Sequence, residues 1–183
     1  MTPQQIADIM PNAKRLDMMA PPLIRAMEEA RINTPLRQAA FLAQLAHESG
    51  ELRWMVELSS GKAYEGRKDL GNVQPGDGPR YKGRGPIQLT GRANYRRAGE
   101  ALGLPLEAEP DQVATPEVGF RVAAWFWSSH HLNTLADTIS AAGPCPEFDA
   151  ITRMINGGLN GKPLRDMHFA RACAVLGVTL PHP

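Results

Sequence analysis

A glutamate ends a segment rich in alanine, leucine and phenylalanine, and two more of interest follow at short range. Glu48 comes after His47 at the end of "FLAQLAHESG", and Glu57 and Glu65 lie further along the same stretch. Cleavage of a glycosidic bond needs one carboxylic acid to protonate the leaving oxygen. It also needs a second carboxylate that activates water or attacks the sugar. The spacing permits this chemistry, although glutamates so spaced are also typical of solvated surface charge.

Glu48 fits the role of the acid better than its neighbours do. We expect it at the carboxyl end of an apolar helix, with Trp54 six residues further on. An apolar environment and the negative end of a helix both disfavour a charged carboxylate. Gly50 is a plausible helix stop, and a turn there would allow the chain to reverse and bring Glu57 to face Glu48.

Helix signals dominate the rest of the chain. A capping threonine followed by proline, or proline alone, predicts helix starts at Thr2-Pro3, Pro21-Pro22, Thr34-Pro35, Thr115-Pro116, Pro146 and Pro163. The segment 117–131 is apolar on nearly all sides and should form a central buried helix, with Trp125 and Trp127 in the core. His130 and His131 lack acidic or cysteine partners, which favours ordinary surface or core histidines over metal ligands.

The middle of the chain is different, because residues 59–86 are rich in glycine and proline. We expect turns here, with one or two short strands at 80–82 and 86–90. The predicted fold is therefore mainly α, with two helical lobes and a small strand and loop region beside a groove. Residues 1–183 are interpreted as a single catalytic domain without a separate wall-binding module.

Composition and charge limit the classes of function that the chain can have. The chain has 183 residues, 43 % of them hydrophobic, and a net charge of +1, which gives no general argument for nucleic-acid binding. Cys145 and Cys173 are predicted to be unpaired thiols. No secretory signal and no run long enough to cross a bilayer is visible, so we expect a chain made in the cytoplasm without stable membrane insertion.

Three blocks in a fixed order add a resemblance. "AHESG", "YKGRGPIQLTGRANY" and "RMINGG" together resemble the catalytic domain of glycoside hydrolase family 19, which includes chitinases and many phage endolysins. The resemblance covers roughly residues 35 to 175. It implies a lysozyme-like fold and hydrolysis by single displacement with inversion, without metal or cofactor. The compact middle is similar to the version found in phage and prophage lysis proteins.

The resemblance also assigns roles to individual residues. It makes Glu48 the general acid and Glu57 the general base, with Glu65 as the rival base and Thr90 as a helper that holds the water. The residues implied to line the sugar groove are Gln88, Asn94, Tyr95 and Asn156. His47 could orient the acid or make only a structural hydrogen bond, and Trp54 and Tyr64 could stack on a sugar or pack in the core.

The favoured function is an endolysin that hydrolyses β-1,4 bonds of peptidoglycan glycan strands as a monomer, reaching the periplasmic wall through a membrane pore. A chitinase acting on N-acetylglucosamine polymers is the first alternative, and a non-catalytic wall-binding module is the second. A basic cluster is either a solvated face or an attractor for an anionic polymer, and it comprises Lys82, Arg84, Arg92, Arg96 and Arg97.

Overall fold

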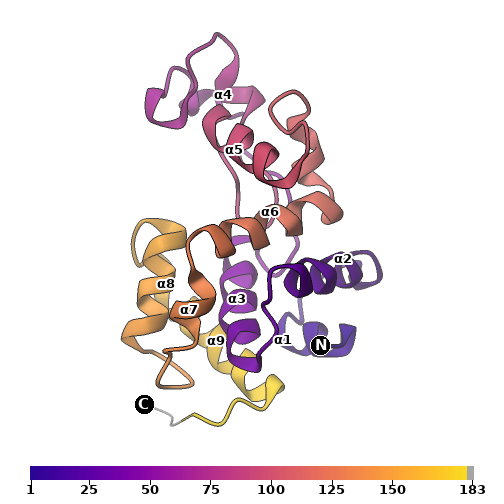
Figure 1. The fold of residues 1–183 in the computed structure, drawn as a ribbon, viewed down its shortest axis with the longest axis vertical. Coiled ribbons are helices and arrows are strands. Elements are labelled where there is room, and N and C mark those ends of the chain that lie inside the picture. Colours follow the sequence, from indigo (N-terminus) through magenta and orange to yellow (C-terminus); the bar gives the residue numbers. More distant parts are fainter. Residues whose placement is uncertain (181–183) are drawn as a thin grey trace.

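The computed structural model describes residues 1–180, and these form two helical lobes of unequal size (Figure 1). The α-helices are α1 (Pro3–Ile9), α2 (Leu16–Glu29), α3 (Pro35–Glu48), α4 (Asp77–Arg80), α5 (Arg92–Leu102), α6 (Pro116–Ser129), α7 (Leu132–Ala136), α8 (Pro146–Asn156) and α9 (Lys162–Leu176). Three short 3₁₀ helices are η1 (Lys62–Tyr64), η2 (Lys68–Leu70) and η3 (Pro110–Ala114). We call residues 57–114 the upper lobe and the other described residues the lower lobe. The prediction of a mainly α, two-lobed, lysozyme-like fold is confirmed.

The lower lobe is built around α3, which is buried along residues 39–46 and packs mainly on α9. Thr34 caps α3, since its side-chain oxygen accepts a hydrogen bond from the Arg37 amide at 3.2 Å, and Pro35 occupies the first helical position. Phe41 meets Trp127 of α6 edge to face, with ring centroids 5.2 Å apart. These contacts hold the end of α3 in a fixed position beneath the upper lobe.

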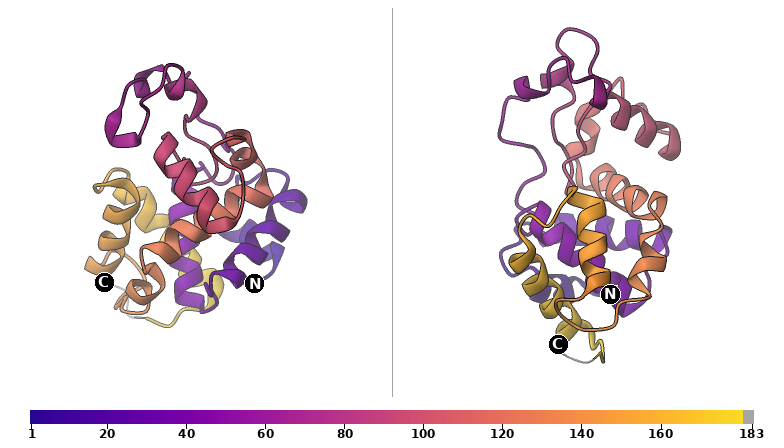
Figure 2. Two further views of the ribbon diagram at one scale, coloured as in Figure 1. Left: turned by 45° about the horizontal axis from the view of Figure 1, so that its top comes forward. Right: turned by 90° about the vertical axis from the view of Figure 1, so that its left-hand side faces the viewer.

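The upper lobe has a smaller core of its own, formed by Tyr81, Leu89, Tyr95, Ala98, Leu106, Val113 and Val122. Val122 belongs to α6, whose Phe120, Ala123 and Trp127 lie in the lower core. Helix α6 therefore runs along the boundary and contributes side chains to both lobes. Two further views show the same separation, with the loops before α5 projecting away from the lower helices (Figure 2).

The helix starts at Pro3, Pro35, Pro116 and Pro146 are confirmed, but the expected start of the second helix is wrong. Helix α2 begins at Leu16 and carries Pro21 and Pro22 in its interior. A proline there removes a backbone hydrogen bond and costs about 3 kcal/mol. The helix continues because its buried face, which includes Met19 and Leu23, packs against α6.

The two short strands expected at 80–82 and 86–90 are also wrong. Arg80 ends helix α4, and the described part of this region holds only isolated bridges that join Val56 to Arg84 and Arg84 to Leu89. Pro86 has no amide hydrogen to donate, and Gln88 has a positive φ of 54°, so a regular ladder cannot extend. None of the described helices is both long and apolar enough to cross a membrane.

Candidate active site

A tight turn after α3 fixes the position of Glu48, which is the last residue of that helix. The Ser49 hydroxyl donates to the Leu45 carbonyl at 2.6 Å and accepts from the Leu52 amide at 2.7 Å. Residues 50–52 all have positive φ, between 58° and 62°. Non-glycine residues rarely adopt this conformation, so the hydrogen bonds and the burial of Leu52 must offset its cost.

The Glu48 carboxylate contacts a buried cation, which the sequence analysis did not expect. Its Oε1 accepts a hydrogen bond from Nη2 of Arg165, a residue of α9 that is only 1 % exposed. Arg165 also donates to Gln44 Oε1 at 2.5 Å and to the Asn160 carbonyl at 3.0 Å. A buried arginine with three acceptors has no rotational freedom, so it holds the Glu48 side chain in place.

His47 and Asn156 both contact the segment that leads from α8 to Arg165. The His47 ring packs against Gly161, where an added Cβ would come within 2.1 Å of a ring carbon. Burial lowers the pKa of His47 and the charge of Arg165 lowers it further, although Glu48 partly opposes this. Asn156 ends α8 half-exposed, with its side-chain nitrogen 3.4 Å from the Asn160 carbonyl. The loop between α8 and α9 therefore packs on the end of α3 through Gly161 and His47.

Glu57 lies on the chain that enters the upper lobe, and three donors hold its carboxylate. Oε1 accepts from the Ser59 hydroxyl at 2.5 Å and from the Tyr64 hydroxyl at 3.0 Å, and Oε2 accepts from the Gly83 amide at 2.9 Å. Burial alone would raise the pKa of Glu57. These hydrogen bonds and the charge of Lys82 outweigh it, so the pKa lies below its usual value.

Glu65 has a different environment. Its two carboxylate oxygens accept from the amides of Gly76 and Gly78, at 2.7 and 2.8 Å. An added Cβ at Gly78 would come within 2.6 Å of the Glu65 amide nitrogen, so the two backbone segments lie in close contact. Glu65 thus ties together the loops of the upper lobe.

Gln88, Thr90 and Asn94 lie together on the side of the upper lobe that faces the lower lobe. The Thr90 hydroxyl donates to the Gln88 carbonyl, and the Asn94 amide donates to the Thr90 carbonyl, each at 2.8 Å. The Gln88 side chain also faces Glu57, because the oxygens of both would contact a Cβ added at Gly83.

Tyr95 does not line this surface, so its predicted place in the groove is wrong. It is 0 % exposed, and its hydroxyl donates to the Lys82 carbonyl at 2.8 Å and accepts from Arg84 at 3.1 Å. Burial raises the pKa of Tyr95 to about 12. Tyr95 is α-helical and follows Asn94 directly, so the two side chains must point in different directions.

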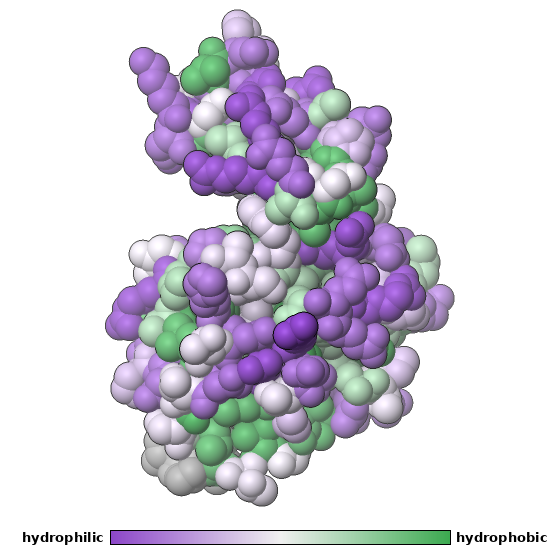
Figure 3. All heavy atoms as spheres, viewed as in Figure 1, coloured by the Kyte–Doolittle hydropathy of each residue, from purple (hydrophilic) through white to green (hydrophobic). Residues whose placement is uncertain are grey.

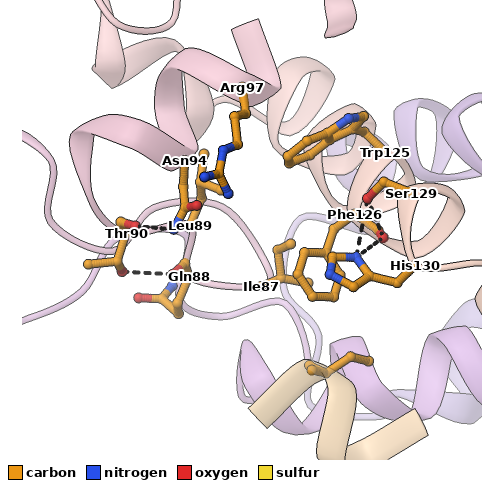
Figure 4. A pocket seen from close by; sticks show the side chains of 11 residues that line it. Ile87, Gln88, Leu89, Thr90, Asn94, Arg97, Trp125, Phe126, Ser129 and His130 are labelled. Atoms are coloured by element: carbon orange, nitrogen blue, oxygen red, sulfur yellow. Dashed lines mark hydrogen bonds between the residues drawn. The ribbon is translucent and has the colours of Figure 1, made fainter. Parts of the chain in front are cut away.

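A hollow of about 420 Å³ lies between the lobes (Figure 4) and forms part of the indentation seen between them in the space-filling view (Figure 3). Its lining comprises Ile87, Gln88, Leu89, Thr90, Asn94, Arg97, Trp125, Phe126, Ser129, His130 and Ile155. Trp127 is in the core, as predicted. Trp125, expected in the core, is only partly buried against the upper core and also lines the hollow.

Sequence reasoning missed Arg165, although the chain contained a signal for it. Arg165 lies one helical turn before Phe169 and two before Ala172, both of which are buried. A cation at this position of an apolar helix face needs a buried partner, and that requirement points to a carboxylate on another helix. Cys145 and Cys173 are buried free thiols, in agreement with the prediction.

Comparison with known proteins identifies the family to which these residues belong. Residues 31–181 match the family model described as chitinase class I, glycoside hydrolase family 19. An endochitinase of Arabidopsis thaliana is 41 % identical over 148 residues, which cover 77 % of this chain and 48 % of that protein. Chitinase 8 of Oryza sativa subsp. japonica is 38 % identical over 162 residues, which cover 76 % and 60 %. The chain spans about half the length of the curated relatives it matches.

Solved structures agree with the sequence matches. Chitinase C from Streptomyces griseus HUT6037 aligns over 100 % of this chain and 78 % of its own, with a TM-score of 0.73 and 27 % identity. The class IV chitinase from Zea mays aligns with a TM-score of 0.69 and 26 % identity, over 96 % of this chain and 87 % of its own. These four relatives carry chitinase names, so they give the phage-lysin subtype no support.

Proposed function

The chain belongs to glycoside hydrolase family 19, the chitinase class I family, and from this premise we propose that it hydrolyses β-1,4 bonds between N-acetylglucosamine units. The single observation that carries the proposal is the set of contacts made by the Glu57 carboxylate. Three hydrogen-bond donors and a nearby lysine favour its ionised form, and an ionised carboxylate is what a general base must be.

In this proposal Glu57 removes a proton from water as the water oxygen attacks the anomeric carbon. Glu48 gives its proton to the glycosidic oxygen, so the bond from the anomeric carbon to that oxygen breaks. Attack and departure occur on opposite faces of the sugar, and the product has inverted configuration. A second turnover needs the proton to return from Glu57 to Glu48 through solvent.

The contact between Glu48 and Arg165 is compatible with the acid role. Arg165 donates to Oε1 only, so a proton on Oε2 can still face the leaving oxygen. Thr90 donates its hydroxyl hydrogen to the Gln88 carbonyl, which leaves its oxygen able to accept a hydrogen bond from the attacking water.

Peptidoglycan is the second candidate substrate. The hollow beside Gln88 contains Arg97, whose guanidinium has neither an ion pair nor a hydrogen bond with any described residue. The endolysin role, release through a membrane pore and the monomeric state stay predictions. The interpretation of the whole chain as one catalytic domain also stays a prediction.

The test is digestion of an N-acetylglucosamine hexamer by the wild type and by Glu48→Gln, followed by mass spectrometry and by proton NMR of the fresh products. We expect shorter N-acetylglucosamine oligomers with the α-anomer formed first, and a loss of at least about a thousandfold in Glu48→Gln with unchanged circular dichroism. Near-normal rates in Glu48→Gln would remove Glu48 from the mechanism. An initial β-anomer would contradict single displacement.

A further inference from the structure

Three of the five cations in the basic cluster of the upper lobe pair with carboxylates. Arg84 pairs with Asp111, Arg92 pairs with Asp77 and Glu107, and Arg96 pairs with Glu107. Lys82 donates to the carbonyls of Glu57 and Ser59 at 3.0 and 3.1 Å. Arg97 alone has neither an ion pair nor a hydrogen bond with any described residue.

The free cation lines the hollow between the lobes. The Arg97 side chain extends from α5 toward the space between Asn94 and Trp125 (Figure 4). The described lining includes no aspartate and no glutamate, so no carboxylate of the protein neutralises Arg97 there. An unpaired guanidinium at the edge of a hollow is suited to bind a carboxylate with two parallel hydrogen bonds.

The rest of the lining is suited to a sugar. Trp125, Phe126, Ile87 and Ile155 form an apolar wall that a pyranose ring or an acetyl methyl group can cover. The Asn94 amide is used on the Thr90 carbonyl, which leaves its side-chain oxygen to accept a hydrogen bond. His130 Nδ1 lies 2.8 Å from the Phe126 carbonyl, and Nε2 makes no hydrogen bond with any described residue.

The hollow is next to the proposed catalytic groups. Gln88 lines it and also approaches Gly83, whose amide binds Glu57. On the opposite side of the hollow, Ile155 precedes Asn156. The side chains of Asn156 and Arg165 both contact the Asn160 carbonyl, and Arg165 also binds Glu48. A glycan chain that extends from the catalytic groups past Gln88 would place one of its sugars in the hollow.

We propose that Arg97 binds a carboxylate carried by an amino sugar of the substrate, and that this contact makes the enzyme prefer glycans with acidic substituents over neutral ones. The matching chemistry is the lactyl carboxylate that alternate sugars of the peptidoglycan strand carry wherever the peptide has been removed. The inference rests on the proposed glycosidase activity and selects its second candidate substrate, peptidoglycan, over neutral N-acetylglucosamine polymers.

The experiment compares two substrates that differ only in charge. Peptide-free peptidoglycan strands carry free lactyl carboxylates, and the same strands with those carboxyls reduced to alcohols are neutral. We measure kcat/KM for both with the wild type, with Arg97→Gln and with the control Arg96→Gln. The control removes the same charge from the same helix, but that guanidinium pairs with Glu107 outside the hollow.

We expect the wild type to favour the acidic strands by at least about tenfold, as for a charge-assisted bidentate contact. Most of the effect should be in KM, and it should weaken with added salt. Arg97→Gln should bring the ratio close to one, and Arg96→Gln should keep it. A wild-type ratio near one, or a ratio unchanged in Arg97→Gln, would overturn the proposal.

A binding measurement separates this inference from the proposed function. Calorimetric titration of Glu48→Gln, with and without Arg97→Gln, measures Kd for the acidic and the reduced strands without any turnover. Tighter binding of the acidic strands that depends on Arg97 supports the carboxylate site even if the wild type cleaves neither strand. Equal binding of both strands overturns it even if the wild type cleaves N-acetylglucosamine polymers.

Discussion

The two carboxyl groups proposed for catalysis are positioned by residues distant from them in sequence. Arg165, which contacts Glu48, lies on the last helix, and Gly83, which contacts Glu57, lies beyond the glycine-rich loops. The two carboxyl groups also differ in the charge of the groups that bind them. Glu57 accepts three neutral hydrogen bonds, whereas Glu48 pairs with a buried guanidinium.

The contest between Glu57 and Glu65 for the role of base can be decided by two substitutions. We expect Glu57→Gln to lower kcat by about a hundredfold to ten-thousandfold, because an amide cannot take the proton from water. Glu65→Gln should mainly lower thermal stability, because it weakens the hydrogen bonds to Gly76 and Gly78. Initial rates and melting curves of both variants test this, and a deeper loss of kcat in Glu65→Gln would reverse the assignment.

At the scale of residues, the sequence motifs led to the prediction of Glu48 and Glu57 as catalytic groups but not to the contacts that hold them. The partner of Glu48 is 117 residues away, and no local pattern encodes that contact. For Tyr95, the motif led to a wrong position in the sugar groove. It stands beside Asn94 in one motif, but helical geometry turns its ring into the upper core, where it meets Tyr81 at 5.4 Å.

At the scale of elements, the upper lobe depends on ion pairs as much as on apolar packing. Asp77, only 1 % exposed, pairs with Arg92, and Glu107 bridges Arg92 and Arg96 at 3.0 and 2.7 Å. The hydrogen bond from Arg96, joined by that from Arg92, outweighs desolvation and lowers the pKa of Glu107 from 4.5 to about 2.

This network predicts a specific acid sensitivity. A carboxyl whose pKa is lower in the folded state contributes stability above its unfolded pKa, and that contribution is lost as pH falls toward the folded value. Glu107→Gln should lower Tm by about 2–4 °C at pH 7, for a loss of about 1 kcal/mol. The difference from the wild type should shrink between about pH 4.5 and pH 2. Calorimetry across this range tests it, and a constant difference would exclude the mechanism.

Helix starts were predictable where threonine and proline act within one turn, as at Thr34-Pro35 and Thr115-Pro116. Helix α2 was not, because packing on α6 outweighs the local preference of Pro21 and Pro22. The loops before α5 were recognised as irregular, but their path is set by contacts such as the one between Gly71 and Ala93, which sequence spacing does not reveal.

At the scale of the whole molecule, the two cores share one helix. Val122 lies in the upper core and Trp127 in the lower, five residues apart on α6. Unfolding of α6 must expose both cores, so we expect the lobes to unfold together.

The distribution of aromatic residues allows this to be tested. All three tyrosines lie in the upper lobe, and Trp127 lies in the lower core. Val122→Ala, which opens a small cavity in the upper core, should lower the free energy of unfolding by about 1–3 kcal/mol. The titrations use a background with Trp54→Phe and Trp125→Phe, in which Trp127 is the one remaining tryptophan. Urea titrations followed by tyrosine absorbance and by tryptophan fluorescence should shift to the same lower midpoint. Separate midpoints would show that the lobes unfold independently.

Because α6 belongs to both lobes, glycan bound against α6 should stabilise residues far from the hollow. Trp125, Phe126 and Ser129 of α6, and His130 directly after it, line the hollow opposite Gln88 and Asn94 of the upper lobe. A sugar held there contacts both lobes at once, and it binds only while both are folded. Free energy of binding is then added to the cost of every opening that exposes α6. Bound glycan should therefore slow amide hydrogen exchange deep in both cores, at sites that no sugar touches.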